Sequence, residues 1–251
     1  MPDHPVVLVT GGSRGIGAAT CRLLASRGYD LAVNCRSDRA AGDRVAAECR
    51  ALGAQAAVVV GDVSIEEQIT AVFDRAVEAL GPLSHVINNA GITGRSSPLA
   101  DAPGDVIRTC IDVNVTGAIL VAREAARRLS TGRGGEGGSI VNISSVAATL
   151  GSPGEYVWYA ASKGAIDALT VGLAQELATE GVRVNAVSPG LVDTEIHALS
   201  TEDAGRVARI GPLIPLGRPG LAAEIAEAVA FLVSAGASYV TGANIRVSGG
   251  R

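Results

Sequence analysis

The sequence predicts an α/β fold, a single-domain doubly wound parallel sheet (Rossmann fold) with helices on both faces. Short apolar segments alternate with longer amphipathic ones, which is typical of strands joined by crossover helices. No linker or shift in composition divides the 251 residues, and α/β domains often reach this length. Hydrophobic residues make up 47% of the chain and aromatic ones only 3%, so we expect a large aliphatic core. We therefore predict one domain over residues 1–251.

The individual elements follow from this alternation. Seven apolar segments are predicted as strands, at 6–10, 30–35, 56–63, 84–91, 138–145, 182–190 and 244–250. Amphipathic segments between them are predicted as helices, near 16–27, 39–52, 65–80, 103–130, 156–180 and 221–234. Parallel strands are buried on both faces, and right-handed crossovers place helices on each side of the sheet. An irregular segment near 191–220 precedes the last helix.

Composition and charge exclude several classes of protein. The net charge of −4 argues against a general nucleic-acid surface, for which a basic patch is expected. The four cysteines form no CxxC and the three histidines are scattered, so we expect no metal site. The start of the chain does not resemble a signal peptide, and no apolar run approaches the roughly 18 residues of a membrane span. A cytoplasmic protein without nucleic-acid or membrane partners is expected.

A glycine-rich segment, TGGSRGIG at 10–17, follows the first predicted strand. It is neither GxGxxG nor a P-loop, but Gly11, Gly15 and Gly17 meet a similar demand. Glycines allow a tight turn and close approach to a pyrophosphate, and the following helix directs its free N–H groups at the anion. The segment predicts a dinucleotide site, with an ordinary glycine turn as the alternative.

The end of the second strand bears on which dinucleotide binds. NAD sites usually carry an acidic residue there, whereas NADP sites use arginine for the 2′-phosphate. Here two neutral residues precede Arg36, and Ser37 and Arg14 are further candidates for the phosphate. The pattern favours NADP (NADPH) over NAD, although Asp38 keeps NAD open.

The segment YAASK, residues 159–163, contains the only lysine of the chain. On a helix, Tyr159 and Lys163 are neighbours on one face. A lysine beside a phenol is expected to lower its pKa and favour proton exchange, which arginine would do poorly. The alternative is a surface lysine beside a core tyrosine. Tyr156 competes for the same role, but Ala160 stands four residues after it.

Together these segments resemble the classical short-chain dehydrogenase/reductase family over nearly the whole chain. The pieces that carry the resemblance are TGGSRGIG at 10–17, DV at 62–63, NNAG at 88–91, Asn114 in NVTG, ISS at 143–145, YAASK at 159–163 and SPG with Thr194 at 188–194. The stretch GSPGEYVWYAASKGAID also resembles a subgroup labelled 3-oxoacyl-carrier-protein-reductase-like or glucose-1-dehydrogenase-like.

The resemblance implies a role for each matching residue. The implied catalytic residues are Asn114, Ser145, Tyr159 and Lys163. The implied cofactor-binding residues are Gly11, Gly15 and Gly17 at the pyrophosphate, with Ser13 and Ile16 in the same loop; Arg36, Ser37 and Arg14 at the 2′-phosphate; Asp62 and Val63 at the adenine; Asn89, Ala90 and Gly91 along the ribose; Tyr159 and Lys163; and Pro189, Gly190, Val192 and Thr194 at the nicotinamide.

The serine depends on the alignment. Family members usually have 12 residues between serine and tyrosine, which here selects Val146, a residue without the required hydroxyl. The intervening segment is therefore one residue longer than usual. Alignment on the strand selects Ser145, with Ser144 as the alternative.

The implied activity is hydride transfer between NADPH and a carbonyl or secondary alcohol. Tyr159 would be the acid/base, Ser145 would bond the substrate oxygen, and Asn114 would hold a water that relays protons to Lys163. The alternatives are an NAD-dependent alcohol or sugar dehydrogenase and a non-catalytic dinucleotide-binding regulator. The resemblance also implies a homotetramer or homodimer and a small-molecule substrate, covered by the segment near 191–220, where His197 faces either substrate or solvent.

Overall fold

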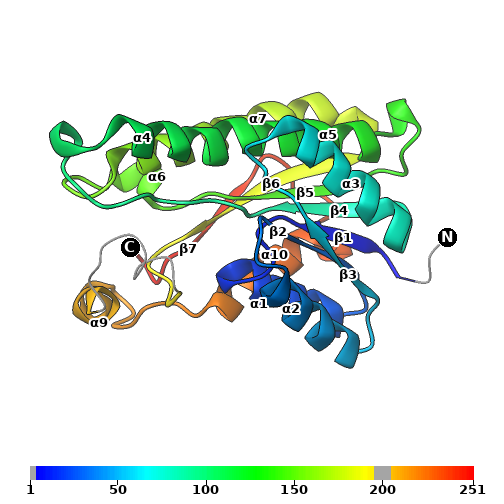
Figure 1. The fold of residues 1–251 in the computed structure, drawn as a ribbon, viewed down its shortest axis with the longest axis horizontal. Helices are drawn as coiled ribbons and strands as arrows, with labels where there is room; N and C mark the ends of the chain where they lie inside the picture. Colours follow the sequence, from blue (N-terminus) through cyan, green and yellow to red (C-terminus); the bar gives the residue numbers. More distant parts are fainter. Residues whose placement is uncertain (1–3, 195–204) are drawn as a thin grey trace.

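A computed structural model describes residues 4–194 and 205–251 of the chain. A single seven-stranded sheet crosses the molecule in the order β3-β2-β1-β4-β5-β6-β7, and every neighbouring pair is parallel (Figure 1). The strands are β1 (Val6–Val9), β2 (Asp30–Cys35), β3 (Ala56–Val60), β4 (Leu83–Asn88), β5 (Gly138–Ile143), β6 (Val182–Pro189) and β7 (Asn244–Val247). The strand order reverses between β1 and β4, the point at which ligands bind in doubly wound sheets. The predicted fold class is confirmed.

Helices cover both faces of the sheet (Figure 1). One layer contains α1 (Gly15–Ser26), α2 (Arg39–Ala51) and α10 (Ala222–Val233), and the other contains α3 (Glu66–Leu80), α4 (Gly104–Ile111), α5 (Ala118–Leu129) and α7 (Val157–Leu177). Side chains alternate across β1, so that Val7 and Val9 belong to the core under α1 and α10, while Val6 and Leu8 belong to the core under α3 and α5. Burial on both faces explains why the strands are apolar without alternation.

The helix predicted over 103–130 is one helical stretch with an irregular centre. A π-helical segment, Asp112–Gly117, separates α4 from α5. A Cβ on Gly117 would lie 2.4 Å from the Val63 carbonyl oxygen, so the helix can pass this close to the loop after β3 only with glycine there. Single π turns are rare and frequently accompany functional sites.

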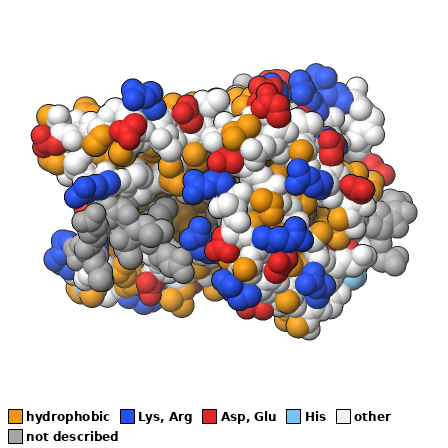
Figure 2. Space-filling view, viewed as in Figure 1, with side chains coloured by type: hydrophobic (Ala, Val, Ile, Leu, Met, Phe, Trp, Pro, Cys, Tyr) orange, Lys and Arg blue, Asp and Glu red, His pale blue; other side chains and the backbone are white. Residues whose placement is uncertain are grey.

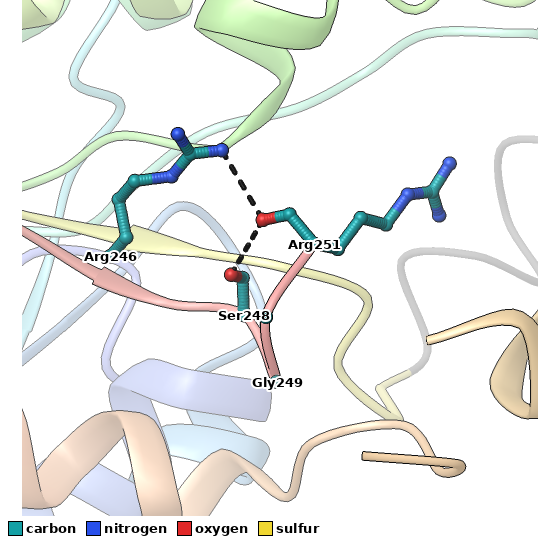
Figure 3. Close-up of a pocket in the computed structure, with 5 residues that line it drawn as sticks. Arg246, Ser248, Gly249 and Arg251 are labelled. Carbon is teal, nitrogen blue, oxygen red and sulfur yellow. Dashed lines mark hydrogen bonds between the residues drawn. The ribbon is translucent and has the colours of Figure 1, made fainter. Parts of the chain in front are cut away.

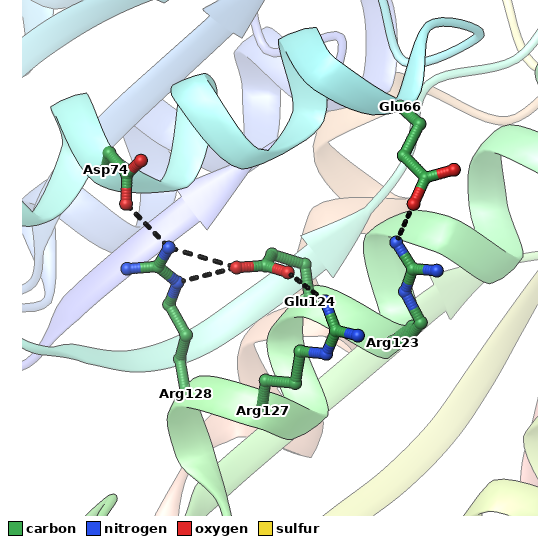
Figure 4. A network of polar contacts seen from close by, with 6 residues as sticks. All are labelled: Glu66, Asp74, Arg123, Glu124, Arg127 and Arg128. Atoms are coloured by element: carbon green, nitrogen blue, oxygen red, sulfur yellow. Dashed lines mark hydrogen bonds and ion pairs between the residues drawn. The ribbon is translucent and has the colours of Figure 1, made fainter.

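Arginines connect α5 to α3 on the outer surface of this layer (Figure 4). Arg128 pairs with Asp74 of α3 at 2.7 Å and with the buried Glu124 at 3.0 Å. Arg123 donates to Glu66 at 2.6 Å. Exposed ion pairs contribute little to stability. Arg128, however, donates two hydrogen bonds to Glu124 and so compensates the charge of a carboxylate that burial would otherwise destabilise.

Smaller features differ from the predicted boundaries. The third strand ends at Val60 rather than 63, because the chain turns at Asp62, whose carboxylate accepts hydrogen bonds from the backbone and hydroxyl of Ser64. Two short helices were not predicted, α6 (Ala147–Leu150) and α9 (Arg206–Ile210). Short 3₁₀ turns lie at Leu99–Asp101, Thr131–Arg133, Ala178–Glu180, Gly211–Leu213 and Ala235–Ala237.

Three further features concern the charged side chains at the surface, the cysteines and the apolarity of the helices. On the face shown in Figure 2, basic side chains are dispersed among acidic and apolar ones. All four cysteines are buried free thiols. Within residues 4–194 and 205–251, no helix combines the length and apolarity needed to cross a membrane.

Candidate active site

The predicted site residues gather at the carboxyl ends of the central strands. The glycine loop follows β1, the NNAG segment follows β4, Ser145 follows β5, and the 189–194 segment follows β6. Because neighbouring parallel strands end at the same edge of a sheet, segments far apart in sequence meet here.

The glycine loop is shaped for close approach. Gly11 and Gly15 have φ angles of 62° and 51°, in the left-handed region that glycine adopts without strain. A Cβ on Gly17 would lie 2.4 Å from the Gly11 carbonyl oxygen, so this position also requires glycine. Helix α1 starts at Gly15, and the Arg14 side chain does not cap it. The backbone N–H groups of its first turn, including that of Ile16, are therefore donors without helical partners.

Two asparagines hold the glycine loop from behind. Asn34 accepts from the Gly11 N–H at 3.2 Å and donates to the Val59 carbonyl at 3.0 Å, which links the loop to β2 and β3. Asn89 donates to the carbonyls of Thr10 and Gly11 at 2.8 and 3.2 Å. The side chain of Asn89 thus fixes the loop, and Ala90 extends this link through its N–H bond to the Thr10 hydroxyl.

The segment after β6 closes the site from the opposite side. A Cβ on Gly15 would lie 3.5 Å from Thr194 Cγ2, so this segment faces the glycine loop. Val192 forms an isolated β-bridge with Gly220, and Gly190 passes so close to Ser248 that its Cβ would lie 2.8 Å from Ser248 Cα. Pro189 ends β6. His197 and the centre of the predicted substrate-covering segment, at 195–204, lie outside the described residues.

Tyr159, Lys163 and Ser145 are brought together at the start of α7. The Lys163 ammonium lies 5.7 Å from the centroid of the Tyr159 ring and donates to the Ile143 carbonyl at 2.8 Å. The Ser145 side chain acts on Tyr159 and lowers the pKa of its phenol. Ser144 is turned away and donates to Asp167 at 2.6 Å. Of the two candidate serines, Ser145 therefore shares the site with the tyrosine.

The protonation equilibria differ from the expectation for Tyr159. Burial raises the pKa of Tyr159 to about 12, and the side chain of Ser145 offsets only part of this increase. Burial also lowers the pKa of Lys163 to about 8. The expectation of a lowered phenol pKa is therefore wrong for the protein alone, because the loss of hydration dominates and the nearby Tyr156 and Cys110 raise the pKa further.

Asn114 lies in the π-helical segment, and its amide is bonded to the chain that follows β4. Its amide accepts from the Ile92 N–H at 2.8 Å and donates to the Ile92 carbonyl at 2.7 Å. A Cβ on Gly91 would lie 3.3 Å from Asn114 Oδ1 and 3.4 Å from Lys163 Nζ. Asn114 and Lys163 therefore approach the chain at the same glycine, from two different helices.

The end of β2 presents a basic surface. Arg36 and Ser37 are exposed directly after the strand. The carboxylate of Asp38 accepts from the Ala41 N–H at 3.0 Å and caps α2. Val63, the predicted adenine contact next to Asp62, is buried beyond β3.

A pocket of about 240 Å³ lies between the glycine loop and α2. It is lined in part by Ser13 and Arg14 and by Arg44, a residue that the sequence reasoning missed. The signal for Arg44 was available, because the residue stands one turn into the helix after β2, where its side chain can return toward the loop.

A second pocket, of about 370 Å³, lies at the end of β7 (Figure 3). Its lining includes Arg246, Ser248 and Arg251, and the first two donate to the Arg251 carbonyl oxygen at 3.2 and 2.7 Å. No site residue was predicted there. Gly190 adjoins Ser248, so this pocket borders the segment after β6.

Known proteins with the same architecture place the chain in a family. A family model described as enoyl-(acyl carrier protein) reductase matches residues 11–251. The uncharacterized oxidoreductase YgfF of Escherichia coli is 48% identical over 98% of this chain and 99% of its own length. A 3-ketoacyl-(acyl-carrier-protein) reductase from Brucella melitensis, solved with NADH, superposes with a TM-score of 0.90 at 31% identity, covering 98% of both chains. A short-chain dehydrogenase from Burkholderia cenocepacia, solved with NADP, has a TM-score of 0.90 at 35% identity over 98% of this chain and 97% of its own.

These matches extend over the strands, the glycine loop and the YAASK helix alike. The chain is an oxidoreductase that belongs to the classical short-chain dehydrogenase/reductase family, in the subgroup of 3-oxoacyl-carrier-protein reductases and glucose 1-dehydrogenases.

Proposed function

We propose that the protein transfers a hydride between NADP(H) and the carbonyl or secondary alcohol carbon of a small molecule, with Tyr159 as the acid/base. The observation that carries the proposal is the cluster at the start of α7. There the Ser145 side chain lowers the pKa of a phenol whose ring centroid lies 5.7 Å from a buried ammonium, at the same sheet edge as the glycine loop. A phenol, a hydroxyl donor and a tunable cation are the groups needed to exchange one proton at a carbonyl oxygen.

The residues divide the work of binding and proton transfer. The N–H groups around Gly15 and Ile16 and the hydroxyl of Ser13 would bind the pyrophosphate, and Thr194 would hold the nicotinamide end from the opposite side. Bound NADP would supply the hydride donor or acceptor. Ser145 would donate to the substrate oxygen, and Tyr159 would give that oxygen its proton during reduction.

Lys163 and Asn114 would complete the proton path. Lys163 keeps its proton at neutral pH because its pKa, although lowered to about 8 by burial, still exceeds 7. Its ammonium would donate to the nicotinamide ribose and lower the barrier to phenol ionisation. Since Asn114 reaches the same glycine as Lys163, a water held by Asn114 would connect the lysine to solvent. The pKa of about 12 for Tyr159 suits a proton donor better than a base, which favours reduction.

The preference for NADP rests on the end of β2. Arg36 and Ser37 are exposed there, Arg14 and Arg44 line the adjoining pocket, and Asp38, the acid directly after them, is engaged as a helix cap. A carboxylate bonded to its own helix is a poor ligand for a ribose 2′-hydroxyl, whereas several guanidinium groups suit a 2′-phosphate. Related structures contain NADP or NADH, which supports a nicotinamide dinucleotide without choosing between the two.

One titration distinguishes the proposed NADP-dependent enzyme from the alternative, an NAD-dependent alcohol or sugar dehydrogenase. Binding of NADPH and NADH is followed through nicotinamide fluorescence for the wild type, Arg36→Ala and the exposed control Arg50→Ala. We expect NADPH to bind at least about tenfold more tightly than NADH, and Arg36→Ala to remove most of that ratio. Equal affinities in the wild type would overturn the NADP preference, and binding of neither would overturn the dinucleotide site.

Self-association completes the proposal. Ile119 on α5 and Val171 on α7 are 43% and 48% exposed, on the layer of helices through which family members pair. We propose a homotetramer, or a homodimer through one such face, in the cytoplasm. Light scattering coupled to size-exclusion chromatography would separate these from a monomer.

A further inference from the structure

A second charged cluster lies beside the proposed acid/base and belongs to none of the roles above. Arg206, the first residue of α9, is only 6% exposed. Its guanidinium bonds both carboxylate oxygens of Glu155, with Nη2 to Oε2 at 2.7 Å, and donates from the same nitrogen to the Tyr156 hydroxyl at 2.9 Å. It also lies over the Tyr156 ring, 5.7 Å from the centroid. A buried guanidinium with this many partners is fixed in position.

Tyr156 transmits this fixed position to Tyr159 in two ways. The two rings meet edge to face, with centroids 5.6 Å apart and planes at 89°. The Tyr156 carbonyl also accepts from the Tyr159 N–H at 3.0 Å and so starts the first turn of α7. Both the ring and the backbone of Tyr159 therefore depend on where Tyr156 lies.

The loop before Tyr156 needs an external anchor. This is the segment that is one residue longer than the family pattern. Ser152 has φ of 47°, the one left-handed non-glycine residue in the described part of the chain, between Gly151 and Gly154, which are also left-handed. Such a backbone persists only where its surroundings hold it. Here the Glu155 carbonyl accepts from the Ser97 N–H at 2.8 Å, and Arg206 holds the Glu155 side chain.

We propose that Arg206 is a positioning residue for catalysis. By binding Glu155 and Tyr156, it fixes the ring and backbone of Tyr159 and couples α9 to the reacting phenol. The inference rests on the proposed role of Tyr159. Its placement on α9 is the new element, because α9 lies about 50 residues beyond Tyr156 in sequence and reaches the site through this contact and through the apolar cluster of Leu191, Ile210 and Ile214.

The first test compares turnover of four variants. Arg206→Met removes the clamp, Arg206→Lys keeps the charge but loses the fork, Glu155→Gln weakens one partner, and Arg209→Met is the matched control, an exposed arginine on the same helix. With NADPH and a panel of a β-keto ester, a cyclic diketone and an aldose, we expect kcat to fall about 10–100-fold for Arg206→Met, with KM and NADPH affinity changed by less than about threefold. Arg206→Lys should recover part of the loss. Unchanged kcat, or an effect on KM alone, would overturn the positioning role.

Two further measurements keep the test decisive. If Arg206 acts through Tyr156, adding Arg206→Met to Tyr156→Ala should change kcat no further, whereas multiplying losses would contradict the coupling. Ultraviolet titration of tyrosinate, as the difference from Tyr159→Phe, needs no substrate. Burial holds the pKa of Tyr159 near 12, so the wild type should show no ionisation of this residue up to about pH 11, and Arg206→Met should show it. If Arg206→Met leaves the ionisation of Tyr159 unchanged, the inference is overturned. If instead the ionisation changes but Tyr159→Phe keeps full turnover, the proposed function fails and the structural coupling stands.

Discussion

Two tyrosines lie one helical turn apart at the start of α7, and each is paired with a buried cation. Lys163 Nζ is 5.7 Å from the ring centroid of Tyr159, and the Arg206 guanidinium is 5.7 Å from that of Tyr156. The pairs differ in what else the cation binds. Lys163 donates to a neutral backbone carbonyl, whereas Arg206 is bonded to a carboxylate.

This difference decides which pair can exchange a proton. Without a carboxylate bonded to it, the buried lysine has its pKa lowered to about 8, close enough to neutrality to respond to a neighbouring charge. The pKa of Arg206 is raised by its hydrogen bonds to Glu155, so that its charge is permanent. A cation whose pKa can be tuned suits proton transfer, and a permanently charged one held by a carboxylate suits a structural role. The two tyrosine–cation pairs thus serve different purposes, according to whether the cation is a lysine or an arginine and to what else it binds.

Replacing each tyrosine by phenylalanine should give the largest difference in kcat between the two pairs. Tyr159→Phe removes the proposed proton donor, and we expect kcat to fall at least about 10³-fold while NADPH binding persists. Tyr156→Phe keeps the edge-to-face ring contact and loses only the bond to Arg206, so its kcat should fall less than about tenfold. Steady-state kinetics with the same carbonyl panel measures both. Similar losses in the two variants would mean that the pairs are not functionally distinct.

Replacing the tunable cation by a fixed one gives the next largest effect. Lys163→Arg keeps the positive charge, but a planar fork cannot occupy the space of a compact ammonium that donates to the Ile143 carbonyl. We expect kcat to decrease by about 10²-fold, and nicotinamide fluorescence to report weaker NADPH binding. A Lys163→Arg variant with normal turnover would show that charge alone is sufficient.

The smallest expected effect is on the free energy of unfolding, whose pH dependence should differ between Lys163 and Arg206. Folding lowers the pKa of Lys163 from about 10.4 to about 8, so between these values the unfolded chain holds a proton that the folded one has lost. Stability from this group therefore rises with pH, by about 2 kcal/mol between pH 8 and pH 10. Urea unfolding at the two pH values should show this increment in the wild type relative to Lys163→Met.

Arg206 supplies the control for that experiment, because its charge does not change in this range. Arg206→Met is expected to be less stable than the wild type by the same amount at both pH values. Parallel behaviour of the wild type and Lys163→Met would show that the lysine pKa is not lowered in the folded protein.

Much of the fold was accessible from the sequence because the sheet is buried on both faces. Such strands are nearly continuous apolar runs, and β2 was predicted to the residue at Asp30–Cys35. The helix predicted over 156–180 is also present, as α7 over Val157–Leu177. Boundaries set by a single polar contact were missed, as at Asp62, where a carboxylate that caps a turn ends β3 early.

The site residues also fall into those that the sequence could predict and those that it could not. Gly17 and Lys163 could be selected because backbone contact and proton chemistry restrict the residue type at those positions. Arg206 could not, because nothing near it in sequence signals a partner about 50 residues away. The pKa of Tyr159 was also beyond sequence reasoning, since it depends on how completely the phenol is removed from water. Alignment on the strand selected Ser145 with Ser144 as the alternative, but the bond from the Ser144 hydroxyl to Asp167 could be found only in the structure.

The π-helical segment limits how this chain can change in length. A π turn holds one more residue than an α turn, and here that extra residue sits beside Asn114. Deleting one residue between Asp112 and Gly117 would turn this segment into a regular α turn, and α4 and α5 could keep their directions. The residues inside the turn would be rearranged, so Asn114 would lose its hydrogen bonds to Ile92. The helix could therefore become shorter here without a change of fold, but not without a change at Asn114.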